Sequence, residues 1–179
     1  MPCLRGMMFM NNHVLINYEK GLNYPERCEL LVSGVIKSIF PVGLIKENRT
    51  KRGIFDTTGY IRLKDIKEIS INELLNLIVM ITIAFDRIRE YPVFIEEMVI
   101  SLDTTFVDES FSEIKFIYVL SNRYETEEKT FIYLLHLVKK KVLNDNYDIV
   151  GTIIKHINNN GFNTMKIREL IGEIKYELN

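Results

Sequence analysis

The chain has 179 residues, of which 47% are hydrophobic and 11% aromatic, so it can bury a core of ordinary size and is not expected to be disordered. Its 23 basic and 24 acidic side chains give a formal net charge of -1. Nucleic-acid-binding proteins usually carry a clustered basic excess, so we expect a single domain over residues 1–179 with no nucleic-acid partner.

The first part of the chain, about residues 12–56, is predicted to combine strands with one helix. Its expected elements, in chain order, are a strand at 12–17, a helix at 24–40 and a hairpin with strands at 42–45 and 52–56. Pro25 suits a first helical turn, and Pro41 is expected to end the helix because proline cannot continue the hydrogen-bond ladder.

The remainder, residues 57–179, is predicted to be mainly helical. Ser70 and Glu73 have the spacing of a capping box, so a helix is expected from Ser70 to about Tyr91. The other expected elements are a short helix at 61–66, short apolar stretches at 98–102 and 105–107, a strand at 114–120, and helices at 127–143, 145–158 and 164–178 with Thr164 as the last cap.

The most apolar stretch, residues 74–85, favours a buried core helix. It is shorter than the ~20 residues that cross a bilayer, and it contains Asn76 and Thr82. The first ten residues lack the long apolar core and small-residue cleavage site of a signal peptide. We therefore expect no membrane span in this chain and a location in the cytoplasm, including attachment at the membrane periphery through an assembly.

No residue pattern typical of catalysis or cofactor binding is present. His13, His136 and His156 stand far apart, and Cys3 and Cys28 have no nearby partner with metal-ligand spacing. The phosphate-binding loop, the dinucleotide fingerprint, the serine nucleophile elbow and the reactive-cysteine signatures are all missing from the sequence. We therefore expect no enzyme activity, no catalytic residue, no metal site and no cofactor.

Two groups of basic residues are candidate interaction surfaces. Arg49, Lys51 and Arg52 lie at the tip of the expected hairpin. Lys139, Lys140 and Lys141 end an expected helix, where cations also interact favourably with the helix dipole. Either group could contact a protein partner or simply form a solvated face.

A group of carboxylates between Glu96 and Glu113 provides an alternative hypothesis. Paired carboxylates perform acid–base chemistry when their surroundings separate their pKa values, and Asp103 and Asp108 are the members to consider. They fall at expected turns, where Asp and Glu are common for local reasons. The alternative is therefore a nucleotide- or metal-binding domain, or an enzyme, that uses Asp103 and Asp108.

Three consecutive segments carry a resemblance to a known family. They read IFDTTGYIRLKDI at 54–66, LIVMITIAFDRIREYPVFIEEM at 77–98 and VISLDTTFVDESFSEIKFIYV at 99–119. In this order they resemble the domain of unknown function that precedes forkhead-associated domains in Firmicute proteins, and LLVSGVIKSIFPV at 30–42 is similar to a helix of that family. The likeness covers residues 12–177. No forkhead-associated domain follows here, so a missing forkhead-associated or membrane segment is left open.

That family in turn resembles a degraded protein kinase, and similar inactive domains occur on the cytoplasmic side of type VII secretion membrane components. The resemblance implies an α+β fold with a small N-terminal strand-rich lobe containing one helix, followed by a mostly helical lobe with a short β-hairpin. A working kinase needs a Gly-rich loop, an anchoring Lys, His-Arg-Asp and Asp-Phe-Gly. Here the catalytic-loop position reads FIEEM at 94–98, and the strand at 114–119 is not followed by Asp-Phe-Gly.

The leading functional hypothesis is therefore a non-catalytic, pseudokinase-like interaction or scaffold module in bacterial signalling or secretion. The nucleotide or metal hypothesis remains the alternative, and a homo-oligomeric structural protein is a third. The sequence leaves open the identity of the protein partner, the oligomeric state and whether a vestigial nucleotide pocket remains.

Overall fold

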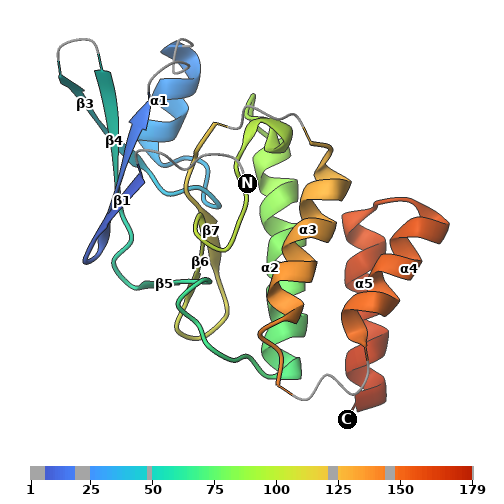
Figure 1. Cartoon of the computed structure of the whole chain (residues 1–179). Coiled ribbons are helices and arrows are strands. Elements are labelled where there is room, and N and C mark those ends of the chain that lie inside the picture. The colour runs from blue at the N-terminus through green and yellow to red at the C-terminus, as the bar shows by residue number, and fades with distance from the viewer. Residues whose placement is uncertain (1–6, 19–24, 48–49, 121–124, 144–147, 179) are drawn as a thin grey trace.

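A four-stranded antiparallel sheet and a group of helices lie side by side, with a small three-stranded sheet between them (Figure 1). The computed structural model describes residues 7–18, 25–47, 50–120, 125–143 and 148–178. The strands are β1 (Met7–Met10), β2 (His13–Tyr18), β3 (Val42–Glu47), β4 (Thr50–Asp56), β5 (Tyr60–Arg62), β6 (Thr105–Asp108) and β7 (Ile114–Phe116). The helices are α1 (Pro25–Ser33), α2 (Ile71–Arg89), η1 (Ile95–Glu97, a single 3-10 turn), α3 (Glu127–Lys139), α4 (Ile149–Asn160) and α5 (Thr164–Leu178).

The first lobe consists of the sheet β1-β2-β4-β3 and helix α1. The central strands β2 and β4 alternate buried with more exposed residues, as a sheet with one covered face requires. Val14, Val42 and Phe55 lie opposite one another across three strands, and all are buried. The predicted hairpin at 42–56 is confirmed, but β1 was not predicted, since its MMFM sequence has neither alternation nor turn residues.

The second lobe is built around α2, which is the most deeply buried helix of the fold. Ser70 accepts a hydrogen bond from the Glu73 backbone, and the Glu73 side chain accepts one from the Ser70 backbone, so the predicted capping box is confirmed. Ten residues of α2 are buried because α3, α5 and the β6–β7 hairpin pack around it. The predicted core helix over 74–85 is therefore correct.

Two predicted helices in the first half of the chain differ from the structure: the first is confirmed only in its N-terminal part, and the second is wrong. The helix expected over residues 24–40 ends at Ser33, because Gly34 has a φ of +68° and turns the chain out of the helix. Residues 38–40 instead pair with β7: Phe40 N–H donates to the Phe116 carbonyl at 3.0 Å, and Phe116 N–H donates to the Ser38 carbonyl at 2.9 Å. The short helix expected over 61–66 is absent: residues 61 and 62 belong to β5, which pairs with β6, and residues 63–65 form a turn.

The helix boundaries in the second half also differ from the prediction. Helix α3 ends at Lys139 rather than at residue 143, since the following residues pair with the segment just before α2 through an Ile69–Val142 bridge. Helix α4 begins after Asp148, whose side chain accepts from the Gly151 backbone N–H, and stops at Gly161, as predicted for that end. The predicted cap Thr164 is instead the first residue of α5, and its hydroxyl donates to Asp86 of α2 at 2.8 Å.

A stacked cation joins the two lobes. Arg62 of β5 lies 3.9 Å from the ring centroid of Phe9 on β1. Its guanidinium also donates two hydrogen bonds to Asp65, at 2.7 and 2.8 Å, and lies 3.5 Å from Asp103. Arg62 thus connects an edge strand of the first lobe to the loop that precedes β6 in the second.

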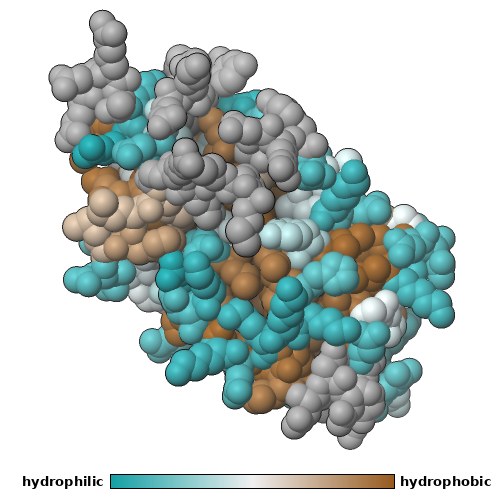
Figure 2. All heavy atoms as spheres, in the orientation of Figure 1, coloured by the Kyte–Doolittle hydropathy of each residue, from teal (hydrophilic) through white to brown (hydrophobic). Residues whose placement is uncertain are grey.

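The surface of both lobes carries apolar patches between hydrophilic side chains on the face shown in Figure 2. The predicted fold class is confirmed: the fold is α+β, with a small strand-rich N-terminal lobe containing one helix, followed by a mostly helical lobe with a short hairpin. No helix among the described residues is long and apolar enough to cross a membrane.

Candidate functional site

The kinase-like fold that the sequence resemblance predicts would hold a nucleotide at the junction between the lobes. In this chain a tyrosine pair closes it from the side of the sheet. Tyr18 of β2 donates a hydrogen bond at 2.7 Å to the carbonyl of Tyr118, and both rings are buried. Burial raises the pKa of both hydroxyl groups, so both tyrosines stay neutral at physiological pH.

An ion pair closes the junction from the side of α1. Arg27 of α1 donates to Glu97 of η1, and both side chains are mostly buried. The same guanidinium lies 5.2 Å from the ring centroid of Phe94. Burial opposes the charge on Arg27, but the hydrogen bond and the charge of Glu97 outweigh it and raise the pKa of Arg27. A cation is therefore present at the junction, and its charge is already matched by a carboxylate.

Aromatic rings also pack together in this region. Phe40 stacks edge-on against Tyr60 at 5.0 Å and against Phe106 at 5.4 Å between ring centroids. The Lys115 ammonium lies 4.7 Å from the Tyr60 ring centroid, and its nitrogen is 3.8 Å from a carboxylate oxygen of Glu113. Phosphate binding requires a cation that can turn towards the ligand, whereas Arg27 and Lys115 both have carboxylates and rings as neighbours.

The two aspartates of the alternative hypothesis do not converge. Asp103 lies just before β6 and contacts Lys64 at 2.9 Å, whereas Asp108 is the last residue of that strand. The strand between them accounts for about 10 Å of separation. Among the described residues, no group of three or more His, Cys, Asp or Glu side chains is placed to hold a metal ion.

Asp108 organises the β6–β7 turn. It accepts hydrogen bonds from the Ser112 backbone N–H at 2.8 Å, from the Glu113 backbone N–H at 2.6 Å, from the Ser112 hydroxyl at 2.8 Å and from the Ser110 hydroxyl. Partial burial works against ionisation, but these donors prevail and lower the pKa of Asp108 to about 2. The carboxylate of Asp108 therefore serves as a hydrogen-bond acceptor within the β6–β7 turn.

Replacing Asp108 with alanine should lower the free energy of unfolding at pH 7 by about 1–3 kcal/mol, since several donors lose their acceptor. Because the folded-state pKa is lowered, the stabilisation is complete above the unfolded pKa of about 3.9 and is lost as the pH falls towards 2. Urea unfolding at pH 7, 4, 3 and 2 should show the gap to the wild type shrinking below pH 4. Glu109→Ala, at the exposed next position, is the control, and a gap independent of pH would contradict this role.

The two predicted basic groups lie at opposite ends of the molecule, at the β3–β4 hairpin and at the end of α3 (Figure 1). On the hairpin, Lys51 is half-buried and Arg52 is exposed, while Arg49 lies outside the described residues. In the second group Lys139 pairs with Asp148, and Lys140 is exposed.

The third lysine of that group, Lys141, has a structural contact. Its ammonium donates to the carbonyls of Lys64, at 3.1 Å, and Ile66, at 2.5 Å. The three consecutive lysines therefore differ in their surroundings: one faces an aspartate, one faces solvent and one holds the loop before α2.

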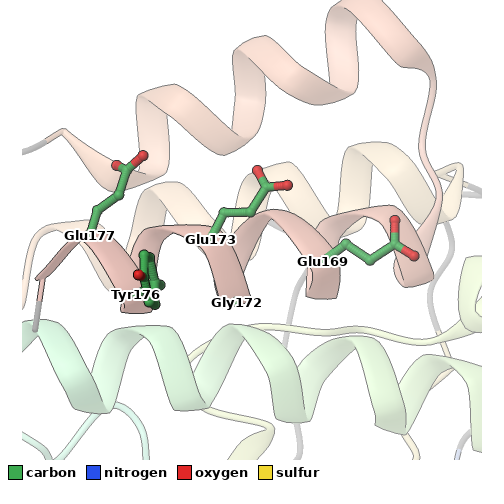
Figure 3. A pocket seen from close by; sticks show the side chains of 5 residues that line it. All are labelled: Glu169, Gly172, Glu173, Tyr176 and Glu177. Atoms are coloured by element: carbon green, nitrogen blue, oxygen red, sulfur yellow. The ribbon is translucent and has the colours of Figure 1, made fainter.

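A shallow hollow on the outer face of α5 was not predicted from the sequence. Glu169, Gly172, Glu173, Tyr176 and Glu177 line it, and the three glutamates follow one another along the helix (Figure 3). Its sequence signal is a glycine in the middle of a helix, flanked by glutamates at a spacing of four. A second hollow, of about 250 Å³, lies between α4 and α5, so neither of these two hollows is at the lobe junction.

The fold defines the class as α+β, with a strand-rich lobe and a mainly helical lobe that are joined by side-chain contacts at their junction. Among solved structures, the cytoplasmic fragment of Staphylococcus aureus EssB is similar, with a TM-score of 0.51 and 12% sequence identity over 88% of this chain and 90% of that one. An apo pseudokinase structure gives a TM-score of 0.49 and 8% identity, over 92% of this chain and 74% of that one.

At this level of identity the likeness to the EssB fragment shows a shared fold. No family model matches the sequence, and no curated protein matches it either. The resemblance to the domain that precedes forkhead-associated domains therefore stays a prediction from the sequence.

Proposed function

We propose that this chain is a single-domain, non-catalytic, pseudokinase-like module that binds a protein partner as a scaffold or regulatory part of a bacterial signalling or secretion assembly. The observation that carries the proposal is the lobe junction, where Tyr18 contacts Tyr118 and Arg27 pairs with Glu97. These contacts occupy the place where a kinase positions its nucleotide.

The physical argument rests on what phosphoryl transfer requires. The reaction depends on holding phosphates and magnesium in place, with little covalent chemistry supplied by the protein. A lysine or arginine must contact the phosphates, and carboxylates must contact the metal. Here Asp103 is engaged by Arg62 and Lys64, while Asp108 is engaged by its own turn, which leaves both poorly suited to a metal.

Two observations support the proposal that the module belongs to a secretion or signalling assembly at the cytoplasmic side of a membrane. The first is the sequence resemblance of residues 54–119 to a family of kinase-like domains linked to forkhead-associated domains and similar to those of type VII secretion components. The second is the fold shared with the EssB cytoplasmic fragment. Of the basic residues assigned to an interaction surface, Arg52 and Lys140 are the exposed ones and thus the first to test for partner contact.

Thermal unfolding with ATP or GTP and magnesium or manganese tests the proposal. We expect no change in Tm, because the Tyr18–Tyr118 and Arg27–Glu97 contacts occupy the junction. A nucleotide at ~100 times its Kd would add about 2.7 kcal/mol, which corresponds to a rise of about 5–10 °C for a chain of this size. The measurement therefore separates the two hypotheses clearly.

Variants identify the source of any shift. A rise in Tm that disappears in Asp103→Ala or Asp108→Ala, but persists in Asp65→Ala, would overturn the proposal in favour of a nucleotide or metal site. Asp65 is a suitable control because it is also held by Arg62 but lies outside the acidic segment. An unchanged Tm for all four proteins supports the interaction module.

A further inference from the structure

The outward face of α5 is an uncovered stripe along the whole helix. Met165, Glu169, Gly172, Glu173 and Tyr176 are all exposed, and their spacing places them on one side of the helix. Tyr176 is 86% exposed and Met165 is 57% exposed. The opposite side, with Ile167 and Ile171, is buried and packs against α2. The stripe therefore lies on a helix whose opposite side is fixed by packing against α2.

Gly172 forms the floor of the hollow in this stripe. A Cβ atom placed on Gly172 would meet no atom within 4 Å. No close packing and no positive φ therefore explains a glycine here, although glycine weakens a helix interior. What the missing side chain does create is room between Glu169, Glu173 and Tyr176 for an apolar side chain of another molecule (Figure 3).

The three glutamates on the exposed face of α5 are arranged in a way that destabilises this helix when no partner is bound. Glu169, Glu173 and Glu177 follow one another at a spacing of four, and like charges at this spacing weaken a helix. Glu177 also lies in the last turn, where the helix dipole disfavours anions. Local rules broken together on one face are typical of a binding surface.

These glutamates are available to an external cation. Within the described part of the chain, none of the three has a Lys, Arg or His nitrogen within 4.0 Å, although Lys166 is exposed on the same helix. By contrast, the carboxylate Asp86 on α2 pairs with Arg89 and Arg168. A cationic partner on α5 would meet charges that the described residues leave unmatched and would relieve the repulsion between them.

We propose that the α5 stripe is a docking surface for a basic amphipathic helix of a partner protein. One apolar side chain of that helix occupies the hollow over Gly172 against Tyr176, and Lys or Arg residues one turn to either side pair with Glu169, Glu173 and Glu177. The inference rests on the proposed function, since it names the kind of partner that the module binds. An anionic membrane surface is disfavoured by the same glutamates.

The test uses the full chain and a fluorescein-labelled synthetic peptide of 18 residues, built from Ala, Leu and Lys, with one Leu flanked by Lys at a helical spacing of four. Fluorescence anisotropy at 0.15 M salt gives the Kd. The charge-reversal pair Glu169→Lys with Glu173→Lys should weaken binding about ten-fold or more. The matched control, Glu29→Lys with Glu68→Lys, makes the same change in net charge at exposed positions outside α5 and should leave the Kd within about two-fold.

Gly172→Leu tests the hollow without removing a charge. Leucine is a better helix former than glycine and a Cβ at this position meets no atom within 4 Å, so the variant should fold at least as well as the wild type. It should nevertheless weaken the peptide about ten-fold, and a peptide whose central Leu is replaced by Ala should no longer distinguish the two proteins. Circular dichroism verifies that both variants remain helical.

Three outcomes would overturn the proposal. The first is equal weakening by both charge-reversal pairs, which would indicate attraction to net charge alone. The second is an unchanged Kd for Gly172→Leu. The third is a concentration-dependent mass lost in Gly172→Leu, which would assign the stripe to a second copy of this chain. None of these readouts involves the lobe junction. A rise in Tm with nucleotide would therefore overturn the proposed function, whereas the Kd of the peptide tests the α5 stripe on its own.

Discussion

Replacing Phe85 with alanine is expected to lower the free energy of unfolding by about 3–5 kcal/mol, the largest effect of any single change considered for this chain. Phe85 is fully buried on α2. Its ring centroid lies 6.1 Å from that of Phe116 in the hairpin and 6.1 Å from that of Phe131 on α3. The truncation would therefore leave a cavity where α2, α3 and the hairpin meet, and these elements cannot all move to fill it.

Urea unfolding followed by circular dichroism measures the loss. Tyr133→Ala on α3 is the matched control, since it removes an aromatic ring from a half-exposed helical position. It should cost less than about 1 kcal/mol. Because a domain of this kind has a total stability of about 5–15 kcal/mol, Phe85→Ala should also lower the yield of folded protein. Similar costs for the two variants would mean that Phe85 is not at the centre of the core.

Gly53→Ala is expected to destabilise the protein by about 1–3 kcal/mol, although it adds only one methyl group. A Cβ on Gly53 would lie 2.6 Å from the Tyr18 ring and 2.9 Å from a Val42 methyl group. The Tyr18 ring would have to shift, and with it the hydroxyl that donates to Tyr118 across the lobe junction. A mutation inside the sheet should therefore disturb the contact between the lobes.

Gly43→Ala is the control for Gly53→Ala, on the neighbouring strand of the same sheet. A Cβ on Gly43 meets its nearest atom at 3.6 Å, an ordinary contact, so this variant should be within about 0.5 kcal/mol of the wild type. Tyrosine fluorescence and urea unfolding report on both variants. Equal stability of Gly53→Ala and Gly43→Ala would show that the Tyr18 ring can move without cost.

The sequence predicts best those elements whose signals are local. Ser70 and Glu73 predict the start of α2 because both partners of the capping box lie within four residues of each other in the sequence. Gly161 predicts the end of α4 because a helix often ends at a residue with a positive φ, and φ at Gly161 is +75°. The α+β class follows from such signals, since strand-like and helix-like periods segregate along the chain.

The errors occur where distant segments decide the structure. The apolar residues Ile36, Ile39 and Phe40 fit a helical stripe, yet residues 38–40 pair with β7, which is more than seventy residues away. β5 pairs with β6 in the same way, although its sequence resembled the start of a short helix. Competition between local propensity and non-local pairing cannot be resolved from a window of neighbouring residues.

The candidate sites show the same division. The basic residues Lys139, Lys140 and Lys141 are easily found as a run, but their separate contacts with Asp148, solvent and the 64–66 carbonyls require the fold. The pair Arg27–Glu97 joins residues seventy positions apart and has no sequence signature. The stripe on α5 could have been noticed, since a glycine between glutamates at a spacing of four is visible in the sequence.

The central position of β7 has a consequence for motion. Phe116 has β6 on one side and residues 38–40 of the first lobe on the other, so backbone hydrogen bonds run continuously from one lobe into the next. Opening the lobes like a hinge would break the bonds between Phe40, Phe116 and Ser38 in a place that water cannot easily reach. These hydrogen bonds therefore favour motion of the two lobes as one body, with the surfaces of the first and second lobes kept at a constant distance and orientation.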